Sequence, residues 1–194
     1  MRPDLRTIRR ITLVAIVAVS AAFVAVRLLD ANRDDGVDSV VLDEPGSYQE
    51  PAVAVNRSLT GKSLRPAELE TLDGRPATVS DLVARGRPML INVWFTTCQP
   101  CKREMPALQA ASRQWADRVD VIGIDPNDSP ATMTAFATDL GVTYELLRDA
   151  TGDFVANNGI ATFPTTLLVS AEGIVIDQFA GEMSADDIAS AMRA

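Results

Sequence analysis

The stretch PMLINVWFTTCQPCKREMPAL, residues 88–108, decides the fold of this 194-residue chain. Its first eight residues are nearly all apolar and predict a buried strand, and the residues after Cys101 predict a helix. Cys98 and Cys101 are the only cysteines, and they fall at the start of that helix. A helix N-terminus stabilises a thiolate through its partial positive charge and unsatisfied N–H groups. We therefore expect thiol–disulfide chemistry, with Cys98 as the attacking thiolate and Cys101 as the more buried resolving thiol.

The composition excludes several other kinds of site. The chain has no histidine, which excludes His-based catalytic triads and the usual copper and catalytic zinc sites. Two thiols alone cannot close a structural zinc site. We therefore expect no metal and no other cofactor. The net charge of −8 also makes the chain a poor binder of nucleic acid.

The first 29 residues form a separate segment. Four arginines between residues 2 and 10 precede an apolar run over residues 11–26. A membrane-spanning helix needs about 20 apolar residues, so this run is short but adequate for a single N-terminal transmembrane helix. Positive charge before the run predicts that the N-terminus lies in the cytoplasm and that the chain after the run lies outside the cell membrane. The alternative is a signal peptide cleaved near the small residues 19–22, which would give a secreted protein.

The rest of the chain divides into an acidic flexible linker over residues 30–58 and one domain over residues 59–194. The linker combines Asp, Glu, Gly and Pro without a sustained period. In the domain, predicted strands alternate with predicted helices, so we expect a central mixed sheet with helices on both faces. The expected strands are 67–72, 78–79, 88–95, 119–125, 144–147, 165–169 and 174–177. Five helices are expected. Three begin after Ser80 as N-cap, after Cys101 and after Ser184 as N-cap. The other two span residues 130–140, where Gly141 ends the helix, and residues 153–158.

Several motifs together resemble the thioredoxin fold. These are the W-x-x-x-C-x-x-C pattern beginning at Trp94, a proline five residues after the second cysteine (Pro106), and a later proline entering a strand (Pro164). Further stretches are similar to the membrane-anchored TlpA/ResA branch of that fold, in the redoxin or AhpC/TSA-like superfamily. They are residues 72–82, 101–108, 129–158 and 159–166. The resemblance covers residues 59–194 and implies a thioredoxin-like α/β domain.

Three positions depart from the pattern of the family. Thr162 stands where a glycine is common. Thr97 replaces the tryptophan usual before the first cysteine, which makes the surface beside the thiol more polar. Asn92 stands where plain thioredoxin carries a buried aspartate that helps to move protons, and asparagine cannot titrate. Between the cysteines, Pro100 restricts the loop and Gln99 brings no charge.

The resemblance also suggests roles for other residues. Glu104 lies one helical turn beyond Cys101 and would tune the thiols and contribute to partner binding, or it is simply a solvated helix carboxylate. The Phe163–Pro164 bond would be cis and lie against the disulfide, leaving the Phe163 backbone free to pair with a partner peptide. Trp94 is expected to pack in the core near the thiols. With Phe163, we count Thr97, Gln99 and Pro100 as residues that meet the substrate.

The resemblance implies a monomeric thiol–disulfide oxidoreductase that acts outside the cytoplasm. Its partners would be thiols and disulfides of exported proteins, such as apocytochrome c during cytochrome c maturation, and a membrane electron donor would restore the dithiol. A disulfide-forming oxidant is the alternative. A thiol peroxidase is disfavoured because its P-x-x-x-T-x-x-C pattern is missing, with Ile91 in place of the proline. A non-catalytic binding module is disfavoured by the intact C-x-x-C motif.

Overall fold

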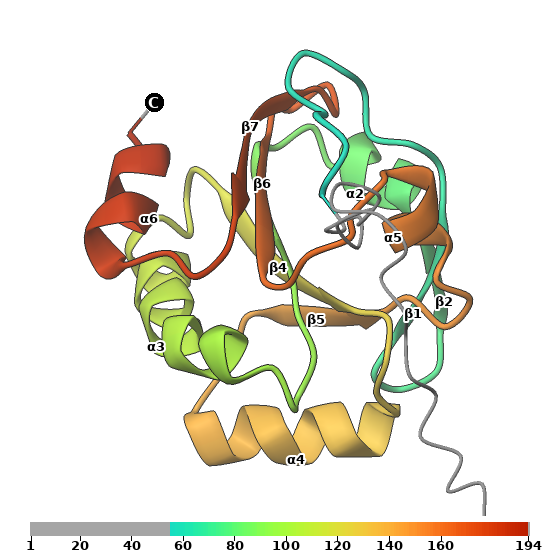
Figure 1. Ribbon diagram of the computed structural model, residues 1–194, viewed down its shortest axis with the longest axis vertical. Helices are drawn as coiled ribbons and strands as arrows, with labels where there is room; N and C mark the ends of the chain where they lie inside the picture. The colour runs from blue at the N-terminus through green and yellow to red at the C-terminus, as the bar shows by residue number, and fades with distance from the viewer. Residues whose placement is uncertain (1–54, 194) are drawn as a thin grey trace, which may run out of the picture. The chain divides into compact units, whose positions relative to one another are not determined.

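The structure is a computed structural model that describes residues 55–193 (Figure 1). The expected transmembrane helix and most of the expected linker lie outside these residues. Within residues 55–193, no helix is both long and apolar enough to cross a membrane. The strands are β1 (Glu68–Thr71), β2 (Pro76–Thr78), β3 (Met89–Val93), β4 (Asp120–Asp125), β5 (Glu145–Arg148), β6 (Thr165–Val169) and β7 (Val175–Ala180). The helices are α2 (Val79–Ala84), α3 (Gln99–Gln114), α4 (Pro130–Leu140), α5 (Asp153–Asn157) and α6 (Ala185–Ala191).

The seven strands form one mixed sheet, in the order β2-β1-β5-β4-β3-β6-β7. The β3–β4 and β4–β5 pairs are parallel, and the other neighbouring pairs are antiparallel. Every residue of β3 and β6 is buried. The sequence of β3 is apolar except for Asn92, as expected for a strand buried on both faces, whereas β6 begins with the two buried threonines Thr165 and Thr166. The predicted mixed sheet is confirmed.

Helices cover both faces of this sheet (Figure 1). One buried cluster includes side chains of α3, α4 and α6, and a second includes side chains of α2 and α5. Side chains alternate along a strand, so β3 sends Leu90 into the first cluster and Met89 and Ile91 into the second. The first cluster holds both cysteines and Trp94. The expected helices on both faces are therefore also confirmed.

Helix boundaries follow side-chain caps, and one predicted cap was wrong. Thr78, not Ser80, caps α2, because its hydroxyl accepts a hydrogen bond from Asp81 N (3.1 Å). Ser80 already lies inside this helix. The caps predicted at Ser184 and Gly141 are confirmed, and Gly141 has a φ of 66°, a conformation that favours glycine.

The domain makes its first contacts slightly earlier than the expected boundary at residue 59. Asn56 bonds to the loop between α5 and β6, and Arg57 N donates to Gly159 O (2.8 Å). We call residues 55–66 the entry segment. Leu59 and Leu64 of this segment are buried in the second cluster. The last residues of the expected linker therefore belong to the folded domain.

Candidate active site

Cys98 and Cys101 form a disulfide at the N-terminus of α3, with their Cα atoms 5.3 Å apart. Cys98 is the N-cap residue, and its sulfur accepts a hydrogen bond from Cys101 N (3.3 Å). Cys98 is 6% exposed and Cys101 is fully buried. This order of burial agrees with an attacking thiol at Cys98 and a resolving thiol at Cys101, and those two roles stay predictions.

The two residues between the cysteines add no charge to the N-terminus of α3. Gln99, between the cysteines, is uncharged and exposed, and Pro100 is half-buried. Lys102, the first cation after Cys101, places its Nζ 5.9 Å from the centre of the Phe136 ring. Phe136 in turn stacks on Trp94, with ring centres 5.3 Å apart. Trp94 is fully buried, as expected for a core residue.

Glu104 is buried, so of the alternatives left open for it the solvated helix carboxylate was wrong. Only 2% of the residue is exposed. Its Oε1 accepts a hydrogen bond from Asn92 Nδ2 (2.6 Å), and its Oε2 accepts one from Met183 N (3.0 Å). Burial raises the pKa of Glu104 to about 7, although both hydrogen bonds favour the ionised form. A group with this pKa can exchange a proton at neutral pH.

Asn92, a residue of β3, links this carboxyl group to the neighbouring strand β6. Its Nδ2 also donates to Thr166 Oγ1 of β6 (3.0 Å). The position that holds an aspartate in plain thioredoxin therefore holds an amide bonded to a titratable glutamate. Sequence reasoning placed both residues in the site, but it did not foresee their contact.

The loop before β6 contributes the second expected part of the site. The Phe163–Pro164 bond is cis, as the resemblance implied. The Phe163 ring meets the Phe95 ring edge to face, with centres 5.2 Å apart, and both residues pack against the cluster that contains the cysteines. Among the described residues, the Phe163 backbone N–H and C=O make no hydrogen bond. Contact of Pro164 with the disulfide, and substrate contact by Thr97, Gln99, Pro100 and Phe163, stay predictions.

The profile of the AhpC/TSA family matches residues 60–178, more than half of the chain. The chain belongs to this family. Thiol-disulfide oxidoreductase ResA of Bacillus thuringiensis (strain Al Hakam) is 24% identical over 129 residues, covering 66% of this chain and 73% of the relative. Thiol:disulfide interchange protein DsbE of Pseudomonas fluorescens biotype C is 32% identical over 138 residues, which cover 70% of this chain and 74% of that relative.

A solved structure shows the same fold. It is a secreted Mycobacterium tuberculosis disulfide oxidoreductase, with a TM-score of 0.58 and 22% identity, covering 67% of this chain and 95% of that one. The thioredoxin-like fold expected from the sequence is confirmed. Together with the Cys98–Cys101 pair, the relatives show that this family member is a thiol–disulfide oxidoreductase of the ResA/DsbE type.

The structure adds a part of the site that sequence reasoning missed. The loop before Cys98 is held by Asp128, whose Oδ2 accepts a hydrogen bond from Thr96 N (2.7 Å). Asp128 is positioned by Asp125, whose Oδ1 accepts from Asn127 N (2.7 Å) and Asp128 N (3.0 Å). The run Asp125-Pro126-Asn127-Asp128 after a buried strand was a visible turn signal, but nothing in sequence indicated which loop it would contact.

Asp125 is itself fully buried, and its Oδ2 has no partner among the described residues. Burial raises the pKa of Asp125 to about 7, against the effect of its two backbone hydrogen bonds. Two carboxyl groups with raised pKa values therefore lie in the elements that carry the redox pair. Glu104 is in α3 after Cys101, and Asp125 holds Asp128, which bonds to the loop before Cys98.

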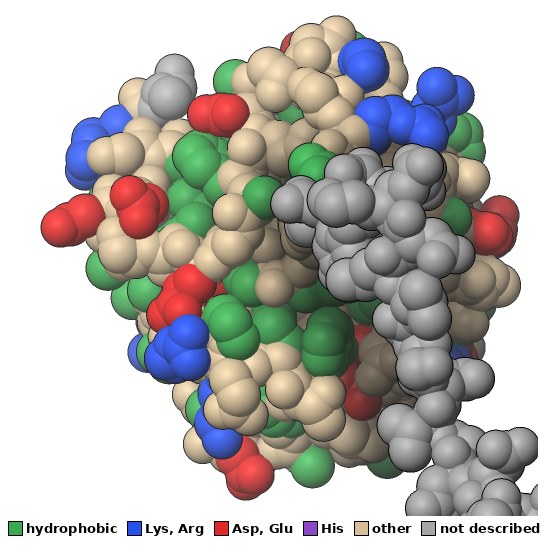
Figure 2. All heavy atoms as spheres, in the orientation of Figure 1, with side chains coloured by type: hydrophobic (Ala, Val, Ile, Leu, Met, Phe, Trp, Pro, Cys, Tyr) green, Lys and Arg blue, Asp and Glu red, His purple; other side chains and the backbone are tan. Residues whose placement is uncertain are grey.

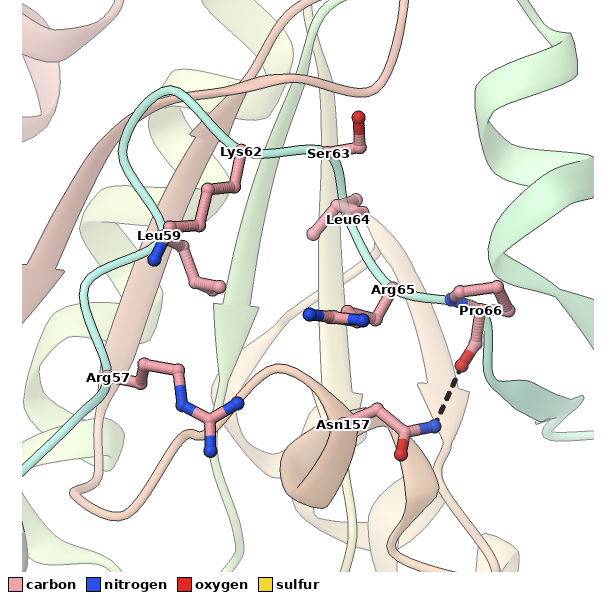
Figure 3. Close-up of a pocket in the computed structure, with 8 residues that line it drawn as sticks. All are labelled: Arg57, Leu59, Lys62, Ser63, Leu64, Arg65, Pro66 and Asn157. Carbon is pink, nitrogen blue, oxygen red and sulfur yellow. Dashed lines mark hydrogen bonds between the residues drawn. The ribbon is translucent and has the colours of Figure 1, made fainter.

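Hydrophobic side chains are exposed on the face of the molecule shown in Figure 2, with charged side chains among them. Within residues 55–193, no group of three or more Cys, His, Asp or Glu side chains is placed to hold a metal ion. A separate pocket of about 420 Å³ lies between the entry segment and α5, and none of the predicted site residues lines it (Figure 3). Its lining residues are Arg57, Leu59, Lys62, Ser63, Leu64, Arg65, Pro66 and Asn157.

Proposed function

We propose that this oxidoreductase reduces disulfides in exported proteins, from a position tethered to the outer side of the cell membrane. The observation that carries the direction is the charge around the redox pair. No cation lies between the cysteines, and the Glu104 carboxyl group is buried one helical turn beyond Cys101. A strong oxidant needs a stabilised thiolate in its reduced form. A nearby carboxylate has the opposite effect, because it disfavours the thiolate.

The reaction exchanges one disulfide for another. The Cys98 thiolate attacks a sulfur of the partner disulfide, forms a mixed disulfide and releases one partner thiolate, which takes up a proton. Cys101 then loses its proton and its thiolate attacks Cys98 Sγ, which breaks the mixed disulfide. The second partner sulfur leaves as a thiolate and takes up a proton. Two electrons pass to the partner, and the Cys98–Cys101 disulfide remains. A thiol-bearing donor in the membrane would return the enzyme to the dithiol.

Glu104 is well placed to handle the protons of these steps. Its pKa of about 7 lets it accept a proton from a thiol and return it near neutral pH. Asn92 and the Met183 N–H fix its two oxygens, so the carboxyl group keeps one orientation in both protonation states. Proton exchange between Glu104 and Cys101 is part of the proposal.

The expected partner class is an exported protein with two nearby cysteines, of which apocytochrome c is one. Its C-x-x-C-H cysteines must be reduced before haem is attached, and the TlpA/ResA-like motifs of the sequence support this assignment. The apolar run over residues 11–26 and the arginines before it support the tether and the location outside the cytoplasm.

The test is the reduction potential of the Cys98–Cys101 pair in the full chain, equilibrated with defined thiol–disulfide buffers. We expect a value near or below about −250 mV, in the range of thioredoxin. A value near about −120 mV, in the range of DsbA, would make the protein a disulfide-forming oxidant instead.

The partner class has a separate test. The Cys101→Ser variant should trap a mixed disulfide with an oxidised C-x-x-C-H peptide, because the resolving thiol is absent. The Cys98→Ser variant is the control and should trap none. Trapping by Cys98→Ser alone would reverse the assigned roles of the two cysteines.

A further inference from the structure

The loop that carries Phe163 and Pro164 is held by a residue far away in the sequence. The Asn56 Oδ1 accepts hydrogen bonds from Ala161 N (2.7 Å) and Thr162 N (2.9 Å). The Asn56 Nδ2 donates to Thr165 Oγ1 (2.7 Å). Backbone N–H groups can only donate, so they fix which end of the amide is the oxygen. One half-buried side chain therefore bonds to both sides of the Phe163–Pro164 peptide bond.

These bonds leave one backbone donor of the loop free. Ile160 N donates to Val155 O (2.9 Å), and the next two N–H groups donate to Asn56. The N–H of Phe163 has no partner among the described residues. On the far side, Pro164 O accepts from Gly181 N (2.8 Å). The free donor thus lies between groups that are already bonded, on a residue that is half-buried. A free backbone N–H of this kind is the group to which an extended partner peptide would bond.

Within the described chain, only Asn56 supplies a side chain that bonds to the Ala161 and Thr162 N–H groups. The residues after Asn56 are themselves held in place. Arg57 N donates to Gly159 O (2.8 Å), and Leu59 N donates to Gln178 Oε1 of β7 (3.0 Å). Leu59 is only 2% exposed. The entry segment is therefore a fixed support for the amide, so Asn56 restrains the loop rather than moving with it.

We propose that Asn56 is a positioning residue for partner recognition. It presets the backbone around Phe163, so that a partner polypeptide binds next to Cys98 without first ordering the loop. Small disulfide reagents need no such backbone contact. Loss of Asn56 therefore weakens reaction with protein disulfides and leaves reaction with small reagents unchanged. This inference rests on the proposed reduction of protein disulfides.

The experiment compares Asn56→Ala with wild type as full chains in detergent. Insulin is the protein disulfide probe, and dithiobis(nitrobenzoate) is the small probe. We expect the KM for insulin to rise about fivefold, with kcat and the rate with the small probe within twofold of wild type. Asn56→Asp keeps an acceptor for the two N–H groups and should recover most of the lost affinity.

Asn157→Ala is the matched control. The Asn157 side chain joins α5 to the entry segment, because its Nδ2 donates to Pro66 O (2.9 Å; Figure 3). Among the described residues, this side chain makes no hydrogen bond to residues 161–165. It should leave the KM for insulin unchanged. Hydrogen exchange of the Ala161 and Thr162 amides should quicken about tenfold or more in Asn56→Ala only, and this readout does not depend on activity.

Two outcomes separate the failure of this inference from that of the proposed function. Equal KM values for insulin in wild type and a folded Asn56→Ala variant would overturn the role of Asn56 and leave the proposed function intact. If wild type does not reduce insulin but still reacts with dithiobis(nitrobenzoate), the proposed reduction of protein disulfides is wrong. The proposed role of Asn56 in partner recognition is then wrong as well.

Discussion

Two buried carboxyl groups, one in the helix that carries the cysteines and one behind the loop before it, differ in their hydrogen bonds. Glu104, after the cysteines, has a protein donor on each oxygen, and one of these donors is the amide of Asn92. Asp125, at the end of β4, has two backbone donors on one oxygen and, among the residues that the structure describes, none on the other. Burial raises both pKa values to about 7. Similar pKa values therefore arise at a carboxyl group that lies one helical turn beyond Cys101 and at another that orders a turn.

The largest expected effect distinguishes the two groups by stability. Glu104→Ala should lower the free energy of unfolding by about 3 kcal/mol, because it leaves the buried Met183 N–H without a partner and opens a cavity between α3 and β3. Urea unfolding at pH 6 measures this loss. Glu68→Ala, at an exposed position of β1, is the control and should change stability by less than about 0.5 kcal/mol. If Glu104→Ala and Glu68→Ala lower the free energy of unfolding equally, the hydrogen bonds of Glu104 to Asn92 and Met183 do not contribute to stability.

Asp125→Ala should cost less, about 2 kcal/mol. The N–H groups that it leaves free belong to Asn127, which is exposed, and Asp128, which is half-buried, so water can replace part of the bonding. The same unfolding measurement applies. A loss greater than that of Glu104→Ala would reverse the ranking of the two carboxyl groups.

The third prediction concerns pH. Both groups bind a proton more tightly in the folded than in the unfolded chain, where their ordinary pKa values are 4.5 and 3.8. Between about pH 5 and pH 7 the unfolded chain therefore holds fewer protons, and stability should fall as pH rises. The slope is at most about 1.4 kcal/mol per pH unit for each group. Burial also raises the pKa of Asp149, which acts in the same direction.

Glu104→Gln and Asp125→Asn should each flatten this slope, and they should differ in chemistry. Only Glu104→Gln should remove an inflection near pH 7 from the rate at which the dithiol reacts with dithiobis(nitrobenzoate). An inflection that persists in Glu104→Gln and disappears in Asp125→Asn would assign the proton exchange to Asp125.

The smallest expected effect is that of Asp128→Ala, about 1 kcal/mol. It removes the acceptor of Thr96 N but leaves the turn held by Asp125. Asp128→Asn keeps a side-chain oxygen and should restore most of the stability. If both variants lose the same amount, the charge of Asp128 rather than its hydrogen bond stabilises the loop.

The local chemistry of the sequence was enough to predict the sheet, most helices and the redox pair. Largely apolar runs predicted β3 and β4, because strands that are buried on both faces have few polar side chains. The turn at residues 171–173 predicted the hairpin of β6 and β7. Gly141 predicted the end of one helix and Ser184 the start of another, because at these two positions the neighbouring residues were enough to indicate the cap. The cap of α2 was misplaced because Thr78 and Ser80 are both good cap residues, and strand pairing decided between them.

The contacts between distant residues could not be predicted in this way. Glu104 meets Asn92 across 12 positions, Asp128 meets Thr96 across 32, and Asn56 meets Ala161 across 105. Each polar residue is ordinary in its local context, and only the fold decides its partner. Burial of Glu104 was missed for the same reason, since the residues that cover it come from β3 and the segment before α6.

The separation of the core into two clusters by the sheet has a consequence for engineering. The cluster beneath α2 and α5 contains neither cysteine, and Phe163 is the only predicted site residue that packs against it. Better packing there, at positions such as Leu82 or Phe154, is a route to a more heat-resistant enzyme. The sulfur environment would stay as it is, because the sheet separates these side chains from it. Thermal stability and the reduction potential of the cysteine pair can therefore be changed by substitutions in different parts of this fold.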